Sequence, residues 1–369
     1  MACFSSFWLT KLTIKLTNQH QVGGDESLGV QKFHDHWVSR VAGVPIYAAF
    51  FFTVLQAAWL LDADVDLTVR LLVCSFPAFA IGLFEDLTRS VGVMPRLVFT
   101  MISAALGWWL LSARLVRVDV PWLDALLAVS PLAVFVLTLI AAAGIAHAVN
   151  IIDGYNGLSG FFILSAFCAL AIVSAQHHDT FLMQVCLIAA ACVAGFLVWN
   201  FPFGRIFLGD AGAYFLGFLL AEVSILLVVR NPGVSAWCPM LIMVYPVWET
   251  LFSMARRARD GLSQMGQADA LHLHQLVYRR LMKRYIGSPK PSDLLLRNSL
   301  TSVYLWIAIL LSIVPAVLFS GNTLVLASFC GLFAVSYVIA YRKIVALRVP
   351  RFLVVRQKQA FRSASRPGE

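Results

Sequence analysis

Four short polar segments interrupt an otherwise apolar chain, and each carries residues that could bind a metal ion or a phosphate. They span residues 82–86, 150–160, 200–212 and 269–275. The first three supply carboxylates and amides, whereas the fourth supplies histidines within a basic loop. Carboxylate oxygens bind Mg²⁺, which neutralises and aligns phosphates that would otherwise repel each other. This combination of residue types therefore points to phosphoryl transfer.

Glu85 and Asp86 form the acidic end of the first segment. Adjacent carboxylates repel each other, and the C-terminal end of a helix already carries partial negative charge. A bound cation would relieve both costs, which makes the pair a candidate metal or catalytic site. The alternative is that both acids are solvated residues at the boundary of a membrane span.

The second segment contains Asn150, Asp153 and Asn156. Asn150 and Asp153 are three residues apart and would lie on one face of a helix. An ordinary Asp-Gly or Asn-Gly turn would explain Gly154 and Gly157. Such a turn does not require an acid and an amide aligned along the preceding helix, so we favour a functional interpretation.

The third segment contains Asn200 and Asp210. Asp210 stands where a helix N-cap is expected, so capping is an alternative to a role in binding. Gly209 and Gly212 would let a phosphate or a metal ion approach the backbone. Asn200 has no expected capping role, and its amide could hydrogen-bond a base such as uracil.

The fourth segment contains His272 and His274. Histidines two apart point in different directions on a helix but converge in a turn or an extended segment. Solvated loop histidines are the alternative, and zinc is disfavoured because two histidines make an incomplete site. Basic residues close behind them favour a phosphate-binding platform. These are Arg279, Arg280, Lys283 and Arg284.

The elements that must position these segments are membrane-spanning helices. The mean hydropathy is +0.81 and 13% of the 369 residues are charged, whereas water-soluble domains usually have about a quarter charged residues. A helix needs roughly 20 apolar residues to cross a bilayer. The predicted fold is an all-α membrane protein, a polytopic bundle of ten to eleven transmembrane helices. Spans are expected near residues 41–61, 67–84, 97–116, 125–149, 158–175, 181–199, 212–229, 235–252, 301–319 and 323–341.

The expected spans divide the chain into five regions. Residues 1–16 carry apolar side chains at helical spacing, but Lys11 and Lys15 make this piece too basic to span, and no cleavable signal is evident. The seven cysteines form no pair with metal-binding spacing. The regions are 1–40, an N-terminal interfacial or truncated first helix and a cytoplasmic loop; 41–252, a transmembrane catalytic core; 253–300, a cytoplasmic histidine and basic loop; 301–341, two C-terminal transmembrane helices; and 342–369, a basic cytoplasmic tail.

Basic residues are distributed unevenly between the two sides of the membrane. All but four of the 28 lysines and arginines fall on one side, and the positive-inside rule makes that side cytoplasmic. All four polar segments then face the cytoplasm. The net charge of +9 is explained by this topology and does not indicate nucleic-acid binding. The four exceptions are Arg70, Arg114, Arg117 and Arg230.

Together the segments resemble the polyprenyl-phosphate N-acetylhexosamine-1-phosphate transferase superfamily. Residues 150–160 match its NxxDGxNGLxG pattern, residues 207–212 its FxGDxG pattern, and residues 269–274 its histidine motif. The resemblance runs from about residue 29 to the loop that holds His272. It implies an enzyme similar to UDP-GlcNAc:undecaprenyl-phosphate GlcNAc-1-phosphate transferases of glycosyltransferase family 4, which begin cell-envelope polysaccharides such as O-antigen or capsule.

The resemblance also implies a reaction. A lipid phosphate attacks the sugar-bearing phosphate of a UDP-sugar, so that an (N-acetyl)hexosamine 1-phosphate moves to undecaprenyl phosphate and UMP leaves. The implied cofactor is Mg²⁺, with Mn²⁺ as an alternative, and the implied location is the bacterial inner membrane with a cytoplasmic active site. The expected partners are a UDP-N-acetylhexosamine, undecaprenyl phosphate and membrane lipid, with a homodimer as a further possibility and no nucleic acid.

Matching the motifs residue by residue implies roles for the polar residues. The implied metal ligands are Asp210 and Asp86, and the implied catalytic residues are Glu85, Asp86 and Asp153. Asn200 would contact the uracil. The other implied substrate-binding residues are Asn150, Asn156, His272, His274, Lys32, Arg40 and Arg96. Four features depart from the family pattern and indicate a divergent subgroup: Glu85 in place of Asp, Ala213 in place of Ser, Gln275 in place of a third His, and no prolines in residues 34–43.

Two other functions compete with this one. Glu222 lies inside an expected span, and an acid within a membrane often marks an ion path in a transporter. No acid or broken helix recurs symmetrically in two halves of the chain, which argues against transport. A catalytically inactive relative with a structural role is the second alternative.

Overall fold

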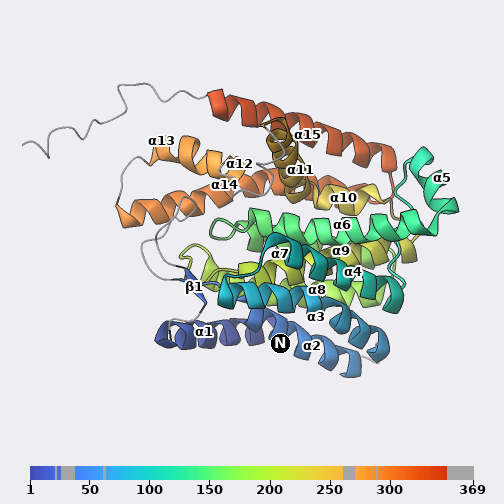
Figure 1. Cartoon of the computed structure of the whole chain (residues 1–369), viewed down its shortest axis with the longest axis horizontal. Helices are drawn as coiled ribbons and strands as arrows, with labels where there is room; N and C mark the ends of the chain where they lie inside the picture. Colours follow the sequence, from blue (N-terminus) through green and yellow to red (C-terminus); the bar gives the residue numbers. More distant parts are fainter. Residues whose placement is uncertain (21–22, 26–37, 61–63, 261–270, 287–289, 347–369) are drawn as a thin grey trace, which may run out of the picture.

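The computed structural model describes residues 1–20, 23–25, 38–60, 64–260, 271–286 and 290–346. These residues form a bundle in which most of the long helices run along one common direction, with α5 and α11 lying across it (Figure 1). The helices are α1 (Ala2–His20), α2 (Gly43–Leu60), α3 (Val65–Thr88), α4 (Val93–Leu110), α5 (Pro121–Val129), α6 (Pro131–Ile152), α7 (Leu158–Gln176), α8 (Thr180–Asn200), α9 (Gly209–Arg230), α10 (Trp237–Ile242), α11 (Val244–Asp260), α12 (Leu273–Leu276), the π-helix η2 (Val277–Met282), α13 (Lys283–Tyr285), α14 (Pro291–Leu318) and α15 (Thr323–Ala346). Two short strands, β1 (Gly24–Asp25) and β2 (Val38–Ser39), pair antiparallel.

Nine helices in the described part of the chain are long and apolar enough to cross a membrane. They are α2, α3, α4, α6, α7, α8, α9, α14 and α15. This result confirms the prediction of a polytopic all-α membrane protein. The number is lower than the expected ten to eleven, because one expected span is broken.

The expected span at residues 235–252 is two helices, α10 and α11, which meet at Met243. Proline accounts for the break. Pro246 has no N–H to donate to the carbonyl of Ile242, and its ring would collide with that carbonyl in a continuous helix. The expected span at 125–149 is also divided, because Ser130 caps α6 by accepting a hydrogen bond from the Ala133 N–H at 3.2 Å. The short helix α5 therefore stands apart from α6.

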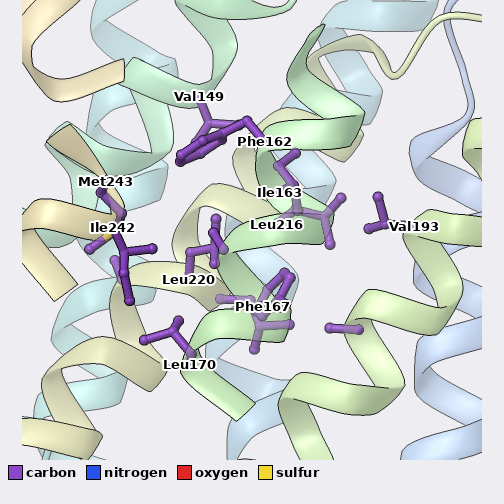
Figure 2. Packing of buried hydrophobic residues seen from close by; sticks show 14 of the residues in the cluster. Val149, Phe162, Ile163, Phe167, Leu170, Val193, Leu216, Leu220, Ile242 and Met243 are labelled. Carbon is purple, nitrogen blue, oxygen red and sulfur yellow. The ribbon is translucent and has the colours of Figure 1, made fainter. Parts of the chain in front are cut away.

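Helix α9 forms the centre of the bundle. In its most apolar stretch 94% of the residues are buried, against 17% in α15. Figure 2 shows Leu216 and Leu220 of α9 packed beside side chains of α7 such as Ile163 and Phe167. Since a helix that is apolar all round must be enclosed by other helices or by lipid, α9 is held on every side by its neighbours, and its two ends are fixed with it.

Helix α1 runs alongside α2 and α8 (Figure 1). The Ser6 hydroxyl donates a 2.6 Å hydrogen bond to the Cys192 carbonyl, and the Trp199 indole N–H donates to the Phe7 carbonyl at 3.1 Å. These contacts attach the first half of α1 to the second half of α8. The prediction of an interfacial or truncated first helix stays a prediction.

Candidate functional site

The backbone around Arg40 is paired with the chain that enters α9. The Phe207 N–H donates to the Ser39 carbonyl at 2.8 Å, and the Gly43 N–H donates to the Leu208 carbonyl at 3.1 Å. These bonds carry Arg40 to the beginning of α9, about 170 residues away in sequence. Backbone hydrogen bonds alone thereby hold the start of α9 in place.

Two glycines let neighbouring helices touch the backbone of α9. A Cβ added to Gly82 in α3 would lie 2.5 Å from the Asp210 carbonyl oxygen and 2.6 Å from the Ala211 Cα. A Cβ on Gly43, at the start of α2, would collide with the Gly212 nitrogen. Because glycine lacks that atom, both helices approach the first turn of α9 at backbone distance. Residues near these glycines are therefore brought close to Asp210.

Asp86 of α3 caps the N-terminus of α9. Its buried carboxylate accepts hydrogen bonds from the Asp210 and Ala211 N–H groups, both at 2.9 Å. The unsatisfied N–H groups and the partial positive charge at a helix N-terminus favour an anion there. The expectation that Asp210 is the N-cap is wrong: α9 begins at Gly209, so Asp210 lies in its first turn. Capping falls to an acid from another helix because the glycine contact brings Asp86 within reach.

Asp210 is the meeting point of three other polar side chains. Its carboxylate accepts hydrogen bonds from Arg96 of α4 at 2.7 Å and from the Asn150 amide of α6 at 2.9 Å. The Arg40 guanidinium lies 3.5 Å from the same carboxylate. Three residues that are widely separated in sequence thus converge on one buried acid.

Asp153 follows α6 and faces the same helix end. Ser159 donates a hydrogen bond to its carboxylate, and the Gly209 backbone also interacts with it. Burial raises the pKa of Asp153 to about 6, and the nearby Asp210 carboxylate adds to this effect. The Ser159 hydrogen bond and the charge of Arg40 lower the pKa in part. Asp86 and Asp153 therefore lie beside the first turn of α9, which carries Asp210.

Glu85 has a different local role from its neighbour. Its carboxylate accepts a 2.8 Å hydrogen bond from the Val91 N–H, in the loop between α3 and α4. It is close enough to Arg96 to interact with its charge. The adjacent acids thus point to two places: Asp86 to the start of α9 and Glu85 to the loop that leads into α4.

The two asparagines of the third and second segments fasten loops together. The Asn200 side chain accepts a hydrogen bond from the Gly157 N–H at 2.7 Å and donates one to the Ile206 carbonyl at 2.8 Å. The Asn156 amide donates to the Pro202 carbonyl at 3.0 Å. The loops after α6 and α8 are therefore locked to each other beside the acids.

Helix α14 supplies residues that the sequence analysis did not identify. The Asn298 side chain accepts a 2.8 Å hydrogen bond from the Asn156 N–H. The Trp306 indole N–H donates to the Gly157 carbonyl at 3.1 Å, and its ring stacks on Phe161 with centroids 4.2 Å apart. Polar residues at the cytoplasmic end of an expected span were the available signal for Asn298.

The two histidines converge, as expected for a turn. Their rings stack with centroids 5.2 Å apart and an angle of 12° between the planes. His274 lies against the loop after α6, because a Cβ on Gly154 would be 3.8 Å from its Nε2 atom and its ring is 5.6 Å from that of Tyr155. The histidine segment therefore borders the loop that carries Asp153.

One of the basic residues behind the histidines makes a structural contact. The Arg280 guanidinium donates a 3.3 Å hydrogen bond to the Ile344 carbonyl near the end of α15, so it ties η2 to that helix.

Lys32 lies outside the described residues. Glu222 is buried in α9 against Gly107 of α4, where an added Cβ would collide with its carboxylate. Glu222 belongs neither to the acids at the start of α9 nor to the histidine segment.

The acids at the start of α9 could supply ligands for a magnesium ion. In the described residues there is no group of three or more His, Cys, Asp or Glu side chains placed to enclose a metal. Magnesium usually takes one or two protein carboxylates and fills its other positions with water and substrate phosphate oxygens. The carboxylates of Asp86 and Asp210 are close enough to interact electrostatically, so together they could supply the protein ligands of an ion held in that way.

Part of the chain resembles a known protein family. The family model described as "Glycosyl transferase family 4" matches residues 68–228. The chain is 24% identical over 258 residues to the probable undecaprenyl-phosphate N-acetylglucosaminyl 1-phosphate transferase of Bacillus subtilis (strain 168), which covers 69% of each chain. It is 24% identical over 277 residues to the undecaprenyl-phosphate alpha-N-acetylglucosaminyl 1-phosphate transferase of Escherichia coli (strain K12), covering 70% of each.

A third relative has a different named lipid. It is the decaprenyl-phosphate N-acetylglucosaminephosphotransferase of Mycolicibacterium smegmatis (strain ATCC 700084 / mc(2)155), 26% identical over 257 residues, which cover 63% of this chain and 58% of the relative. The matched residues 68–228 run from α3 to α9 and include Asp86, Asn150, Asp153 and Asp210. The family match thus falls on the helices that build the acid cluster. The part of the chain from α3 to α9 therefore resembles glycosyl transferase family 4.

Proposed function

We propose that this protein transfers an N-acetylhexosamine 1-phosphate from a UDP-sugar to undecaprenyl phosphate and releases UMP. Transfer of a hexosamine 1-phosphate to a polyprenyl phosphate is the activity for which the relatives are named. The observation that carries the proposal is the convergence of Asp86, Asp153 and Asp210 with two arginines at the start of α9. The product would begin a polysaccharide of the cell envelope.

The reaction needs two anions to meet. An oxygen of the lipid phosphate attacks the sugar-bearing phosphorus, a new P–O bond forms, and the bond to the UMP oxygen breaks with its electron pair leaving on UMP. Arg40 and Arg96 offset negative charge beside the acids. The N–H groups at the start of α9 add partial positive charge at the same place.

Asp153 is the proposed proton acceptor. A carboxyl group with a pKa of about 6 is mostly ionised at neutral pH and still basic enough to take a proton from a phosphate whose second pKa is close to the same value. The Ser159 hydrogen bond fixes the orientation of the carboxylate. Asp153 would therefore raise the fraction of fully ionised lipid phosphate at the moment of attack.

Asp86 and Asp210 would hold the magnesium ion. When bound, Mg²⁺ supplies positive charge that screens the two phosphates from each other and stabilises the charge that develops on the leaving group. The His272 and His274 segment, next to the loop that carries Asp153, would bind a phosphate of the nucleotide-sugar.

The proposed site faces the cytoplasm of the bacterial inner membrane. Figure 1 shows β1 and α13 at one end of the bundle and α5 at the opposite end. The acid cluster lies at the end of the bundle that holds β2, because Ser39 pairs with the chain entering α9. Most lysines and arginines belong to the segments expected at this end of the bundle. The positive-inside rule therefore assigns this end to the cytoplasm.

The test uses purified protein with undecaprenyl phosphate and a panel of radiolabelled UDP-sugars, with and without Mg²⁺. We expect label in the lipid fraction and release of one UMP per transfer for at least one UDP-N-acetylhexosamine. No labelled lipid with any sugar of the panel, from protein that binds UDP-sugars, would contradict transferase activity. Label from a non-nucleotide donor would contradict the assignment of the donor.

A further inference from the structure

A row of aromatic rings joins α1 to the end of α8. The Phe7 ring of α1 lies 5.5 Å from the Trp8 ring and 5.0 Å from the Trp199 ring of α8, measured between centroids. The Trp199 indole N–H donates to the Phe7 carbonyl at 3.1 Å, which fixes the two helices to each other at this point. We call Trp8, Phe7 and Trp199 the aromatic row.

A cation lies at each end of the aromatic row. The Lys11 Nζ atom is 4.6 Å from the Trp8 ring centroid, and the Arg205 guanidinium carbon is 5.6 Å from that of Trp199. Both side chains are exposed. In the part of the chain that the structure describes, neither cation forms an ion pair with a carboxylate, and neither α1 nor the segment 199–208 contains an acid. An aromatic ring attracts a cation without neutralising it, so both charges remain available to an anion.

The aromatic row lies at a boundary of the membrane. Trp199 is the next-to-last residue of α8, which is long and apolar enough to span a bilayer, and tryptophan is enriched where a span meets the headgroups. Helix α1 runs from the aromatic row toward β1 (Figure 1). At 1.5 Å per residue, Lys11 and Lys15 lie about 6 and about 12 Å beyond Phe7 along α1. Both lysines therefore lie at the level of lipid headgroups, at the end of the bundle that holds the acid cluster.

The outward face of α1 is an apolar ridge. Its side chains recur every four residues and are 46–68% exposed: Phe4, Trp8, Leu12 and Leu16. The opposite face carries Ser6 and Thr10, which are fully buried. In a membrane, acyl chains cover an exposed apolar face of this kind. A phospholipid whose acyl chains lie along the ridge would have its headgroup beside Lys11 and Lys15.

We propose that Lys11, Lys15 and Arg205 form a binding site for the phosphate of an anionic phospholipid such as phosphatidylglycerol. Each basic residue near a membrane surface strengthens attraction to anionic lipid by about fivefold. Phosphatidylcholine gains less, because its own ammonium offsets the charge of its phosphate. A general excess of basic residues on one side of the membrane would explain lysines here, but it does not explain why cations from two distant segments converge on one aromatic row.

The test uses full-length protein in phosphatidylcholine liposomes with a trace of phosphatidylglycerol that carries a photoreactive diazirine on its headgroup. After irradiation, peptide mass spectrometry locates the label, which we expect on α1 and on the segment 199–206. Unlabelled phosphatidylglycerol, added as about a fifth of the lipid, should reduce this labelling at least fivefold by competition. Unchanged labelling would show contact without headgroup preference, and competition by undecaprenyl phosphate alone would assign the site to that lipid. Either result would overturn the proposal.

Matched variants separate a defined site from bulk charge. Lys11→Gln/Arg205→Gln should reduce labelling of α1 by about tenfold or more, whereas Lys11→Arg should keep it, because the cation is retained. The control Arg342→Gln/Lys343→Gln removes the same charge from two exposed residues of α15 and should change labelling by less than about twofold. Equal losses in the two double variants would overturn the proposal. Labelling needs no turnover, so a protein without transferase activity would contradict the proposed function and leave this comparison unaffected.

Discussion

The two ends of α9 are built from the same kinds of residue in different proportions. At its C-terminal end, Arg230 donates to Asp179 at 2.7 Å, and Asp179 also caps α8 by accepting the Leu182 N–H at 3.1 Å. At its N-terminal end, Asp86, Asp153 and Asp210 share two arginines and a set of backbone N–H groups.

The difference separates a structural ion pair from a candidate active site. One acid with one arginine and one helix cap leaves little charge uncompensated, so the pair stabilises the fold and needs no ligand. Three acids beside two arginines leave a surplus of negative charge, and a bound cation would relieve it. Arg-Asp contacts alone therefore do not mark function, whereas an excess of acid at a helix start makes that end a candidate site.

Removal of divalent cations should have the largest effect. That effect should arise at the N-terminal end of α9 and not at its C-terminal end. Chelation with EDTA is expected to abolish transfer, and added Mg²⁺ should restore it, because the acid surplus needs the ion to accept two phosphates. The measurement is transfer of label from UDP-sugar to lipid, with the unfolding temperature followed in parallel. Full activity after exhaustive chelation would remove the metal from the proposal.

Replacing Asp210 by Asn should reduce kcat by about 100-fold or more, since it removes a charge at the reacting phosphates. Its matched control is Asp179→Asn, which makes the same chemical change at the opposite end of α9. The activity of the control per folded molecule should stay within about twofold of the wild-type value. Equal losses in the two variants would show that the two ends do not differ in function.

The pH dependence of kcat should report Asp153. Its pKa of about 6 lies above the usual value of an aspartate, so activity should rise as the pH increases through about 6 and then level off. Asp153→Asn should lose this rise together with most of its activity. If Asp153→Asn still shows the same rise of kcat with pH, the titrating group is another one, such as the lipid phosphate.

The same shift has a consequence for stability. A carboxyl group whose pKa is raised on folding favours the protonated form in the native state. Its contribution to the free energy of unfolding is therefore full below about pH 4 and is lost as the pH rises through about 6. Relative to Asp153→Asn, the wild-type protein should lose stability across this window.

Replacing Asp179 by Ala should have the smallest effect on catalysis and a measurable effect on stability. It removes the cap of α8 and leaves Arg230 without its carboxylate partner, which is expected to lower the free energy of unfolding by about 1 to 3 kcal/mol. Denaturant unfolding of detergent-solubilised protein measures the change. An unchanged unfolding midpoint together with lost turnover would reverse the roles assigned to the two ends.

Hydropathy predicted most of the bundle because lipid demands long apolar helices. It did not locate the break at Met243, since an apolar run containing Pro246 has the same hydropathy whether or not the helix is continuous. The resemblance implied roles in one active site for Asp86, Asp153 and Asp210, and the folded chain places all three at the start of α9. The capping of α9 by Asp86 instead of Asp210 depends on backbone contact between helices, which no local pattern contains.

The contact between the Glu249 carboxylate of α11 and Nδ1 of His272, at 2.9 Å, was missed for a related reason. Glu249 lies within a run that was expected to be a span, and such an acid is a recognised sign of function. Glu222 drew attention because it is deeper in its span. The pairing of Glu249 with His272 joins positions 23 residues apart across a loop, so only the folded chain brings the two together.

The bare backbone contacts at Gly43 and Gly82 also bear on how such a chain can diverge in evolution. A side chain at either position has no room, so these two sites tolerate almost no replacement. Exposed positions such as Phe76 and Trp109 face outward and can drift among apolar residues without shifting the first turn of α9. Relatives at 24% identity could therefore share the same arrangement of helices around the first turn of α9. A few glycines would keep these helices in contact while the residues that face lipid change.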